Sequence, residues 1–271
     1  MTALKVGAAL MIEDLPRHRE WLYEADRDLE IQDFVHYDVF RNGWQDTVDR
    51  AKAALDGFQG RIGIHGPYHG LDIDNGDPEL RDVIARRFVS AIEAADALGA
   101  RQMVIHSPFN LWSHHHRHDG MGRQDRLMSA IHALLRPVLA SAETHGVTLV
   151  VENCDDAVPE TRREMVEALA STAIAVSIDT GHAQLSRRMY GAPPVDAFVR
   201  DAGNLLKHVH IQDLDGYADR HWPPGDGEIE WRAVFQALAE CTGEPHLVLE
   251  LKEPAEIPKG FGYLRDQGLA A

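Results

Sequence analysis

The segment Lys207–Trp231, KHVHIQDLDGYADRHWPPGDGEIEW, contains the clearest chemical pattern of the chain. It begins as an alternating strand with His210 near its C-terminal end, and then becomes a polar loop that carries Asp219 and His221. Histidine and carboxylate side chains are ligands that zinc and manganese accept in proteins. Because Asp219 and His221 are two residues apart, an extended loop would place both side chains on one side. The segment therefore predicts a loop with metal ligands that follows a buried strand in the sequence.

Similar short apolar segments recur along the whole chain and alternate with helical segments. We expect strands at residues 4–9, 29–34, 61–65, 102–106, 148–152, 174–179, 206–211 and 246–251. We expect helices at residues 16–25, 46–58, 78–98, 123–145, 159–170, 195–202 and 231–241, and loops at residues 35–44 and in the His114–His118 tract. Strands that are apolar on both faces and separated by helices indicate an all-parallel sheet. Eight such units in 271 residues predict an α/β protein, a closed (β/α)8 TIM barrel that forms one domain over residues 1–271.

The composition is that of a globular protein with a strongly acidic balance. Apolar residues make up 44% of the chain, and 27 Lys and Arg against 43 Asp and Glu give a formal net charge of −16. This charge argues against a broad phosphate-binding surface and disfavours nucleic acid as a partner. Cys154 and Cys241 form no disulfide framework, and no segment resembles a secretion signal or a membrane span. We therefore expect a cytoplasmic protein without a membrane partner, and homo-oligomerisation stays open.

Residues suited to metal binding stand at the ends of six of the expected strands. In a barrel these ends meet at one mouth, where the active sites of this fold lie. Carboxylates and imidazoles that converge there would be costly without cations. The six strand-end residues are His65, His106, Glu152, Asp179, His210 and Glu250, and the loop residues His182, Asp219 and His221 join them. Nine candidate ligands are enough for one to three divalent ions of the zinc or manganese type.

The motifs around these residues resemble those of the xylose-isomerase-like TIM barrel superfamily, which contains sugar isomerases, sugar epimerases and endonuclease IV. The matching segments are IHGPYHG, VIHSPF, LVVENC, SIDTGH, HVHIQD, DRHWPPGDGEIEW and LVLEL, and they run from about Ile62 to Leu251. In this order and spacing, the ENC, IDTGH and GDGEI segments are fairly specific for the superfamily. They do not specify one reaction within it.

The resemblance implies a role for each candidate ligand. In sugar epimerases and isomerases, the positions of Glu152, Asp179, His210 and Glu250 hold one divalent metal, and the position of His182 contacts substrate. In endonuclease IV the same positions, with those of His65, His106, Asp219 and His221 added, hold a trinuclear zinc cluster. All nine positions are filled here, which favours the nuclease or at least a multinuclear site.

Three departures from endonuclease IV favour the sugar branch. The first strand ends in Gly7-Ala8-Ala9-Leu10 rather than in a Gly-x-His segment, and no Lys/Arg run lies in the predicted mouth loops. The turn WPPGDGEIEW resembles the PPGEGxIDW turn of the isomerase and epimerase branch. We therefore expect an isomerase or epimerase of a sugar or sugar phosphate. The alternative is a zinc-dependent phosphodiester hydrolase that cleaves DNA at abasic sites, and a metal-binding barrel without turnover is a third possibility.

The expected isomerase mechanism assigns two carboxylates to catalysis. Removal of a proton next to a carbonyl requires a base, together with a cation that holds the enediolate oxygens. Glu152 and Glu250 are the predicted pair, since one can remove the proton while the other returns it. The residues expected to contact the sugar are His182, Arg220, Lys252, Tyr68 and Trp112.

Overall fold

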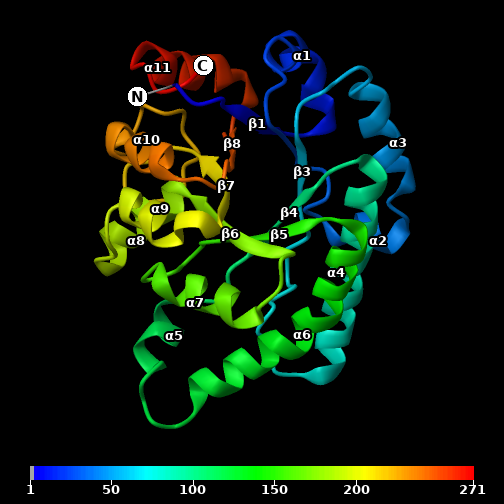
Figure 1. Ribbon diagram of the computed structural model, residues 1–271, viewed down its shortest axis with the longest axis vertical. Coiled ribbons are helices and arrows are strands. Elements are labelled where there is room, and N and C mark those ends of the chain that lie inside the picture. Colours follow the sequence, from blue (N-terminus) through cyan, green and yellow to red (C-terminus); the bar gives the residue numbers. More distant parts are fainter. Residues whose placement is uncertain (1–2) are drawn as a thin grey trace.

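A closed barrel of parallel strands forms the centre of the molecule (Figure 1). The computed structural model describes residues 3–271, so the first two residues of the expected domain lie outside the described part. Strand β8 pairs with β1, with Gly7 opposite Val248, and this pairing closes the barrel. The strands follow one another around it in chain order, which confirms the predicted (β/α)8 barrel. They are β1 (Gly7–Leu10), β2 (Leu29–Ile31), β3 (Ile62–His65), β4 (Gln102–His106), β5 (Thr148–Glu152), β6 (Ile174–Asp179), β7 (Leu206–Ile211) and β8 (His246–Leu249).

Helices cover the outside of the barrel, and the two long helices α4 and α6 pack side by side (Figure 1). The α-helices are α1 (Leu15–Tyr23), α2 (Tyr37–Asn42), α3 (Gln45–Ala54), α4 (Pro78–Leu98), α5 (Leu111–His116), α6 (Arg123–His145), α7 (Glu160–Leu169), α8 (Thr180–Tyr190), α9 (Val195–Ala202), α10 (Trp231–Glu240) and α11 (Ile257–Asp266). Three 3-10 turns, η1 (Ile12–Asp14), η2 (Gly203–Leu205) and η3 (Pro254–Glu256), complete the described elements. None of the helices within residues 3–271 combines the length and apolar character that a membrane span requires.

The register of the strands brings the predicted ligands side by side. His106 is paired with Glu152 across β4 and β5, and Asp179 is paired with His210 across β6 and β7. Parallel strands carry every second side chain to the same face, so the residues two positions earlier also point inward. They include Val104 and Val150, which form a small buried cluster with Ala175. The barrel interior is therefore apolar below the His106–Glu152 pair, whereas Ser177 and His208 lie below the Asp179–His210 pair.

Strand β1 begins at Gly7, three residues later than expected, and it approaches β2 very closely there. A Cβ atom on Gly7 would lie 1.6 Å from the carbonyl oxygen of Asp28, so only glycine fits at this position. Leu4 instead forms an isolated bridge with Ala270 near the C-terminus.

The two loop predictions are wrong, because each of the two segments contains helical residues. Residues 35–44 include α2, and the His114–His118 tract begins within α5. A capping box starts α5: the Asn110 side chain accepts a hydrogen bond from the Ser113 backbone N–H, and Ser113 Oγ accepts one from the Asn110 backbone N–H, both at 2.9 Å. Two further helices, α8 and α11, were absent from the sequence prediction. In α8 the Asp179 carboxylate caps the helix by accepting from the His182 N–H at 2.6 Å.

A buried aspartate holds the long loop that follows β7. The Asp213 carboxylate accepts hydrogen bonds from the Gly225 N–H at 2.9 Å, the Ile229 N–H at 3.2 Å and the Trp231 indole at 2.9 Å. The backbone of Asp213 also pairs with that of Trp222. These contacts explain the Pro-Pro-Gly-Asp-Gly turn, because they fix its ends to the barrel and return the preceding loop residues to the mouth.

Candidate metal centre

Four of the predicted ligands form a compact group at the mouth. One ligand atom from each of Glu152, Asp179, His210 and Glu250 lies within 4.8 Å of the others. His210 Nδ1 lies 2.9 Å from Glu152 Oε1 and 3.5 Å from Glu250 Oε2. Within the described residues, the buried oxygens Glu152 Oε2 and Asp179 Oδ2 have no hydrogen-bond partner. Because such oxygens are costly to bury alone, this group fits a divalent cation.

Two further groups of ligands adjoin the first. His65 Nε2 and His106 Nε2 lie 3.8 and 3.6 Å from Glu152 Oε2. On the other side, His182 Nε2 and His221 Nε2 lie 3.4 and 3.1 Å from Asp219 Oδ2. The structure thus brings all nine predicted ligands together around one mouth. A cavity of about 260 Å³ between them is lined by Gln32, His65, Tyr68, His106, Glu152, Cys154, His182, Asp219, His221 and Glu250.

The charges in this centre are strongly coupled. Burial alone would raise the pKa of Glu152, but the positive charge of His210 and its hydrogen bond hold that pKa well below its usual range. Burial lowers the pKa of His106 to about 3 and raises the pKa of Asp179 to about 6. The neighbouring carboxylates raise the pKa of His210 well above its ordinary value, and metal ligation would require release of its Nδ1 proton. The raised pKa of Asp179 reflects a buried carboxylate whose negative charge is poorly compensated.

The loop residue His221 has a left-handed backbone, with φ of 50°. This conformation is unfavourable for a residue with a side chain and occurs where the surroundings enforce it. The Gln212 side chain contributes, because its Oε1 accepts from the His221 N–H at 3.1 Å while its Nε2 donates to Asp219 Oδ1 at 3.0 Å. Gly181 makes room for this amide, since a Cβ there would lie 2.2 Å from Gln212 Cδ.

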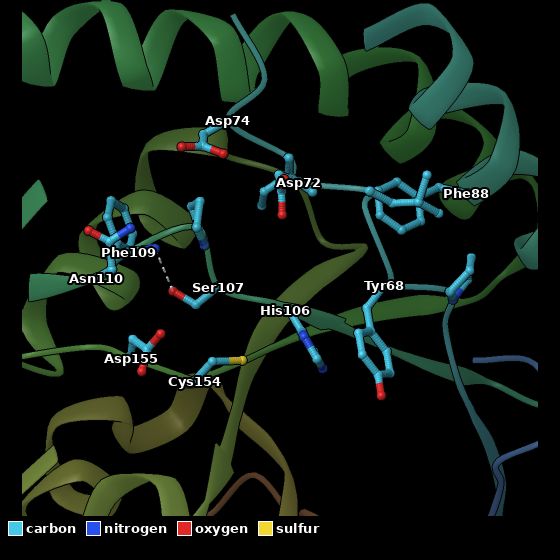
Figure 2. Close-up of a pocket in the computed structure, with 14 residues that line it drawn as sticks. Tyr68, Asp72, Asp74, Phe88, His106, Ser107, Phe109, Asn110, Cys154 and Asp155 are labelled. Atoms are coloured by element: carbon cyan, nitrogen blue, oxygen red, sulfur yellow. Dashed lines mark hydrogen bonds between the residues drawn. The ribbon is translucent and has the colours of Figure 1, made fainter. Parts of the chain in front are cut away.

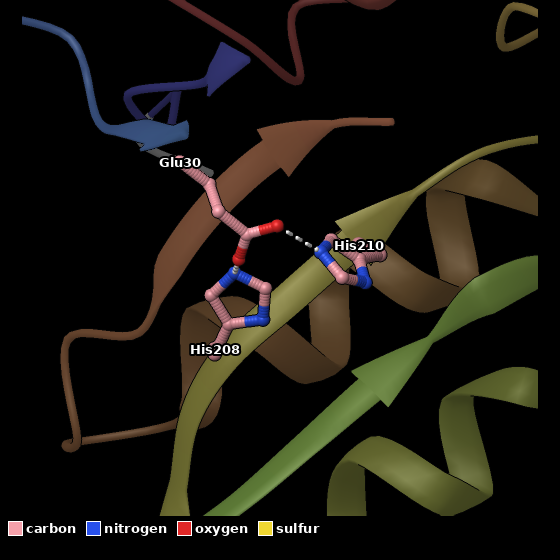
Figure 3. Close-up of side chains that lie close together, drawn as sticks. All are labelled: Glu30, His208 and His210. Carbon is pink, nitrogen blue, oxygen red and sulfur yellow. Dashed lines mark hydrogen bonds and ion pairs between the residues drawn. The ribbon is translucent and has the colours of Figure 1, made fainter. Parts of the chain in front are cut away.

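A second layer of polar residues lies behind His210 and was missed by the sequence analysis (Figure 3). Glu30, on β2, accepts a hydrogen bond through Oε1 from His210 Nε2 at 2.9 Å. Its other oxygen lies 3.1 Å from His208 Nε2, and Ser177 Oγ lies 2.9 Å from His208 Nδ1. Burial opposes ionisation of Glu30, but the charge of His210 lowers its pKa strongly. The available sequence signal was a glutamate in the middle of an apolar strand, where a charge requires a partner.

Gln32 connects this layer to the mouth. Its Nε2 donates hydrogen bonds to Glu30 Oε1 and to Glu250 Oε1, both at 2.9 Å. The amide therefore couples the position of Glu250 to the carboxylate that holds His210. Gln32 lies one residue beyond the end of β2, a strand to which the sequence analysis assigned no functional residue.

The residues expected to contact substrate fall into three places. Tyr68 and His182 line the central cavity, and the Tyr68 ring stacks on His106 with 4.3 Å between ring centres. Arg220 and Lys252 line an adjoining cavity of about 500 Å³ on the Glu250 side of the mouth, where Arg220 is paired with Asp215 at 2.9 Å. Trp112 is 67% exposed on α5 and lines a surface depression with His116. The structure thus separates Trp112 from the other four.

The fold and the site together define a parallel (β/α)8 barrel with a histidine- and carboxylate-rich centre at its mouth. The chain belongs to the xylose isomerase-like TIM barrel family, whose model matches residues 28–267. This membership confirms the resemblance that the sequence motifs indicated.

Individual proteins with a similar fold or sequence are also known. The chain is similar to the crystal structure of a D-tagatose 3-epimerase-like protein, with a TM-score of 0.77 and 21% identity over 97% of this chain and 96% of that one. A Thermus thermophilus protein soaked with ZnCl2 has a TM-score of 0.73 and 24% identity over 97% of both chains. Fructoselysine 3-epimerase of Escherichia coli O157:H7 is 33% identical over 60 residues, which span 22% of each protein.

Proposed function

We propose that the protein is a divalent-metal-dependent isomerase or epimerase of a sugar. The observation that carries this proposal is the group in which ligand atoms of Glu152, Asp179, His210 and Glu250 lie within 4.8 Å of one another. Its two glutamates reach the mouth from different arcs of the barrel, one at the end of β5 and one immediately after β8. The relative named fructoselysine 3-epimerase and the fold shared with a D-tagatose 3-epimerase-like protein support the same chemistry.

The chemistry requires a base, an acid and a polarised carbonyl. A divalent cation bound at this group would polarise the carbonyl of a ketose and so acidify the adjacent C–H bond. One glutamate then removes the proton from that carbon, and the other returns a proton from the opposite side. Removal from C3 and return at C3 inverts the configuration of that carbon, whereas removal from C1 and return at C2 gives an aldose. His182 and Tyr68, which line the cavity, orient the substrate hydroxyls.

Zinc and manganese both suit a site of imidazole and carboxylate ligands, and the three ligand groups offer places for one to three ions. The zinc-soaked Thermus thermophilus structure supports zinc as the first ion to test.

A panel of ketoses tests the proposal. Protein loaded with zinc or manganese is incubated with D-fructose, D-psicose, D-tagatose and D-sorbose, and the products are identified by NMR. The proposal predicts an epimer or an aldose from at least one ketose, and predicts that chelation of the metal stops its formation. Unchanged sugars in every incubation, with a folded and metal-loaded protein, would contradict it.

Metal-assisted phosphodiester hydrolysis is the second candidate, favoured by the three adjoining groups of ligands. The group of His182, Asp219 and His221 exceeds what one ion requires, and hydrolases of this chemistry use several ions. Against it stands the net charge of −16, which repels a polyanion. A DNA duplex with one abasic site separates the two functions. Cleavage at that site, lost in an Asp219→Asn variant, would favour the hydrolase.

A further inference from the structure

A second cavity of about 400 Å³ opens beside the metal centre, on the β3 and β4 side of the mouth (Figure 2). Tyr68, His106 and Cys154 line both this lateral cavity and the central one, so the two share a wall. Its volume is within the range of small-molecule sites, roughly 300–1,000 Å³. A substrate held at the metal centre therefore has room to extend into it. The other residues that line the lateral cavity are Pro67, Leu71, Asp72, Ile73, Asp74, Phe88, Ser107, Pro108, Phe109, Asn110 and Asp155.

The polar groups of the lateral cavity are hydrogen-bond acceptors more than donors. Three carboxylates, Asp72, Asp74 and Asp155, line it together with the Ser107 hydroxyl and the Asn110 amide (Figure 2). Among the described residues, no lysine or arginine lines the cavity. Burial raises the pKa of Asp74, and the charge of Asp72 raises it further. An anion placed here would meet the negative charges of these carboxylates, and no lysine or arginine among the described lining residues would offset them.

The cavity on the Glu250 side of the mouth differs because basic side chains line it beside the carboxylates Asp14, Asp219 and Glu250. Arg220 and Lys252 line it, and it shares Gln32, Asp219, His221 and Glu250 with the central cavity. The metal centre thus lies between an acidic space and a space that contains basic groups. The carbon chain of a ketose extends on both sides of its carbonyl, and we call each side an arm. With the carbonyl at the metal centre, one arm would enter the lateral cavity and the other the cavity lined by Arg220 and Lys252.

We propose that the lateral cavity binds one arm of the ketose, and that this arm ends in a hydrogen-bond donor, a hydroxyl or an ammonium group. Both groups donate to carboxylates, whereas a phosphate at the same place would be repelled by them. The apolar side chains of Leu71, Phe88 and Phe109 cover the carbon chain of the arm. This inference rests on the proposed function and narrows its substrate to a ketose without phosphate on that arm.

The decisive probe is a ketose that carries phosphate on both ends. Whichever arm enters the lateral cavity, the 1,6-bisphosphate of the preferred ketose places a phosphate there. We expect kcat/KM to be roughly a hundredfold lower for the bisphosphate than for the parent sugar. The 1-amino-1-deoxy and 6-amino-6-deoxy derivatives distinguish the two donors. A higher kcat/KM for one of them than for the parent ketose identifies ammonium as the preferred donor, and a kcat/KM no higher than that of the parent identifies hydroxyl. Equal kcat/KM for the bisphosphate and the parent ketose would overturn the proposal.

Variants of the lining residues test whether the lateral cavity causes the difference in kcat/KM between the parent ketose and its bisphosphate. The pair Asp72→Asn and Asp74→Asn removes two negative charges with little change of shape, and should reduce discrimination against the bisphosphate about tenfold. Asp155→Asn, at an exposed position, repeats the test where folding is not at risk. Asp49→Asn, an exposed site on α3 outside the lining, is the matched control for net charge. Unchanged discrimination in both cavity variants would also overturn the proposal. No turnover of any parent ketose would instead contradict the proposed function on which it rests.

Discussion

Glu30 Oε1 and His210 Nε2 are joined by a hydrogen bond of 2.9 Å inside the barrel. An ionised carboxylate only accepts, so the proton must lie on Nε2 of the imidazole. His210 Nδ1 is the nitrogen that faces Glu152 and Glu250. In the metal-free protein Nδ1 also donates to Glu152 Oε1 at 2.9 Å, so His210 is positively charged. A metal bound here would replace the Nδ1 proton, while the bond from Nε2 to Glu30 fixes the tautomer and the ring orientation.

The first prediction concerns this hydrogen bond. Replacement of Glu30 by glutamine keeps the shape but removes the negative charge that orients His210. We expect zinc affinity to fall roughly ten- to a hundredfold, measured by competition with a chromophoric chelator. Glu93→Gln, an exposed glutamate on α4, is the matched control and should leave the affinity unchanged. Equal affinity in Glu30→Gln and the unaltered protein would show that Glu30 has no part in metal binding.

The second prediction concerns Glu152, the carboxylate common to two ligand groups. Glu152→Gln removes a base and a charged ligand while it preserves the side-chain volume. Turnover should fall by at least about a hundredfold, the lower end of what general-base catalysis contributes. Because the variant removes the carboxylate that pairs with His210 at 2.9 Å and leaves the imidazolium less compensated, the metal-free variant should unfold at a lower temperature. A well-folded, metal-free Glu152→Gln protein with full activity would exclude this role.

The third prediction concerns the number of ions. His65, His106, Asp219 and His221 would not need to converge on the mouth if one ion sufficed. We expect at least two zinc ions per chain after loading, measured by elemental analysis, and one fewer in Asp219→Asn. A stoichiometry fixed at one in both proteins would make these residues substrate contacts instead.

The fourth prediction concerns His246, a buried residue of β8 away from the predicted ligands. Burial lowers its pKa to about 3, whereas an unfolded chain has the ordinary value of 6.5. As pH falls below 6.5, His246 binds a proton in the unfolded state but not in the folded state, so the free energy of unfolding decreases. Between pH 7 and 5 this loss is about 2 kcal/mol. Urea unfolding of metal-free protein should show the loss, and His246→Gln should reduce it. Identical pH profiles of the two proteins would refute the assignment.

The sequence predicted the barrel and the meeting of the candidate ligands at its mouth because both depend on short-range patterns. Apolar strands at regular spacing predict parallel pairing, and candidate ligands such as His106 and Glu152 stand at strand ends that any closed barrel brings together. Glu30 was missed because it lies within a strand, and its partners on β7 are 178 and 180 positions away in the chain.

Helix caps account for two of the differences between sequence prediction and structure. The Asn110 and Ser113 capping pair starts α5, so His114, His115 and His116 belong to a helix and not to the expected loop. Asp179 is both a candidate ligand and the N-cap of α8, a helix that the sequence analysis did not predict. The lateral cavity was not predictable in the same way. It forms where the loops after β3, β4 and β5 meet, and loop conformations depend on tertiary contacts.

Incorporation of solvent deuterium tests the central claim most directly. The preferred ketose is converted by metal-loaded protein in deuterated water, and the product is examined by NMR. Because one carboxylate removes the proton and another returns one from solvent, the account predicts deuterium on the carbon next to the carbonyl, and none with Glu152→Gln. A product that keeps its original hydrogen at that carbon, or cleavage of an abasic-site duplex without any sugar exchange, would contradict it.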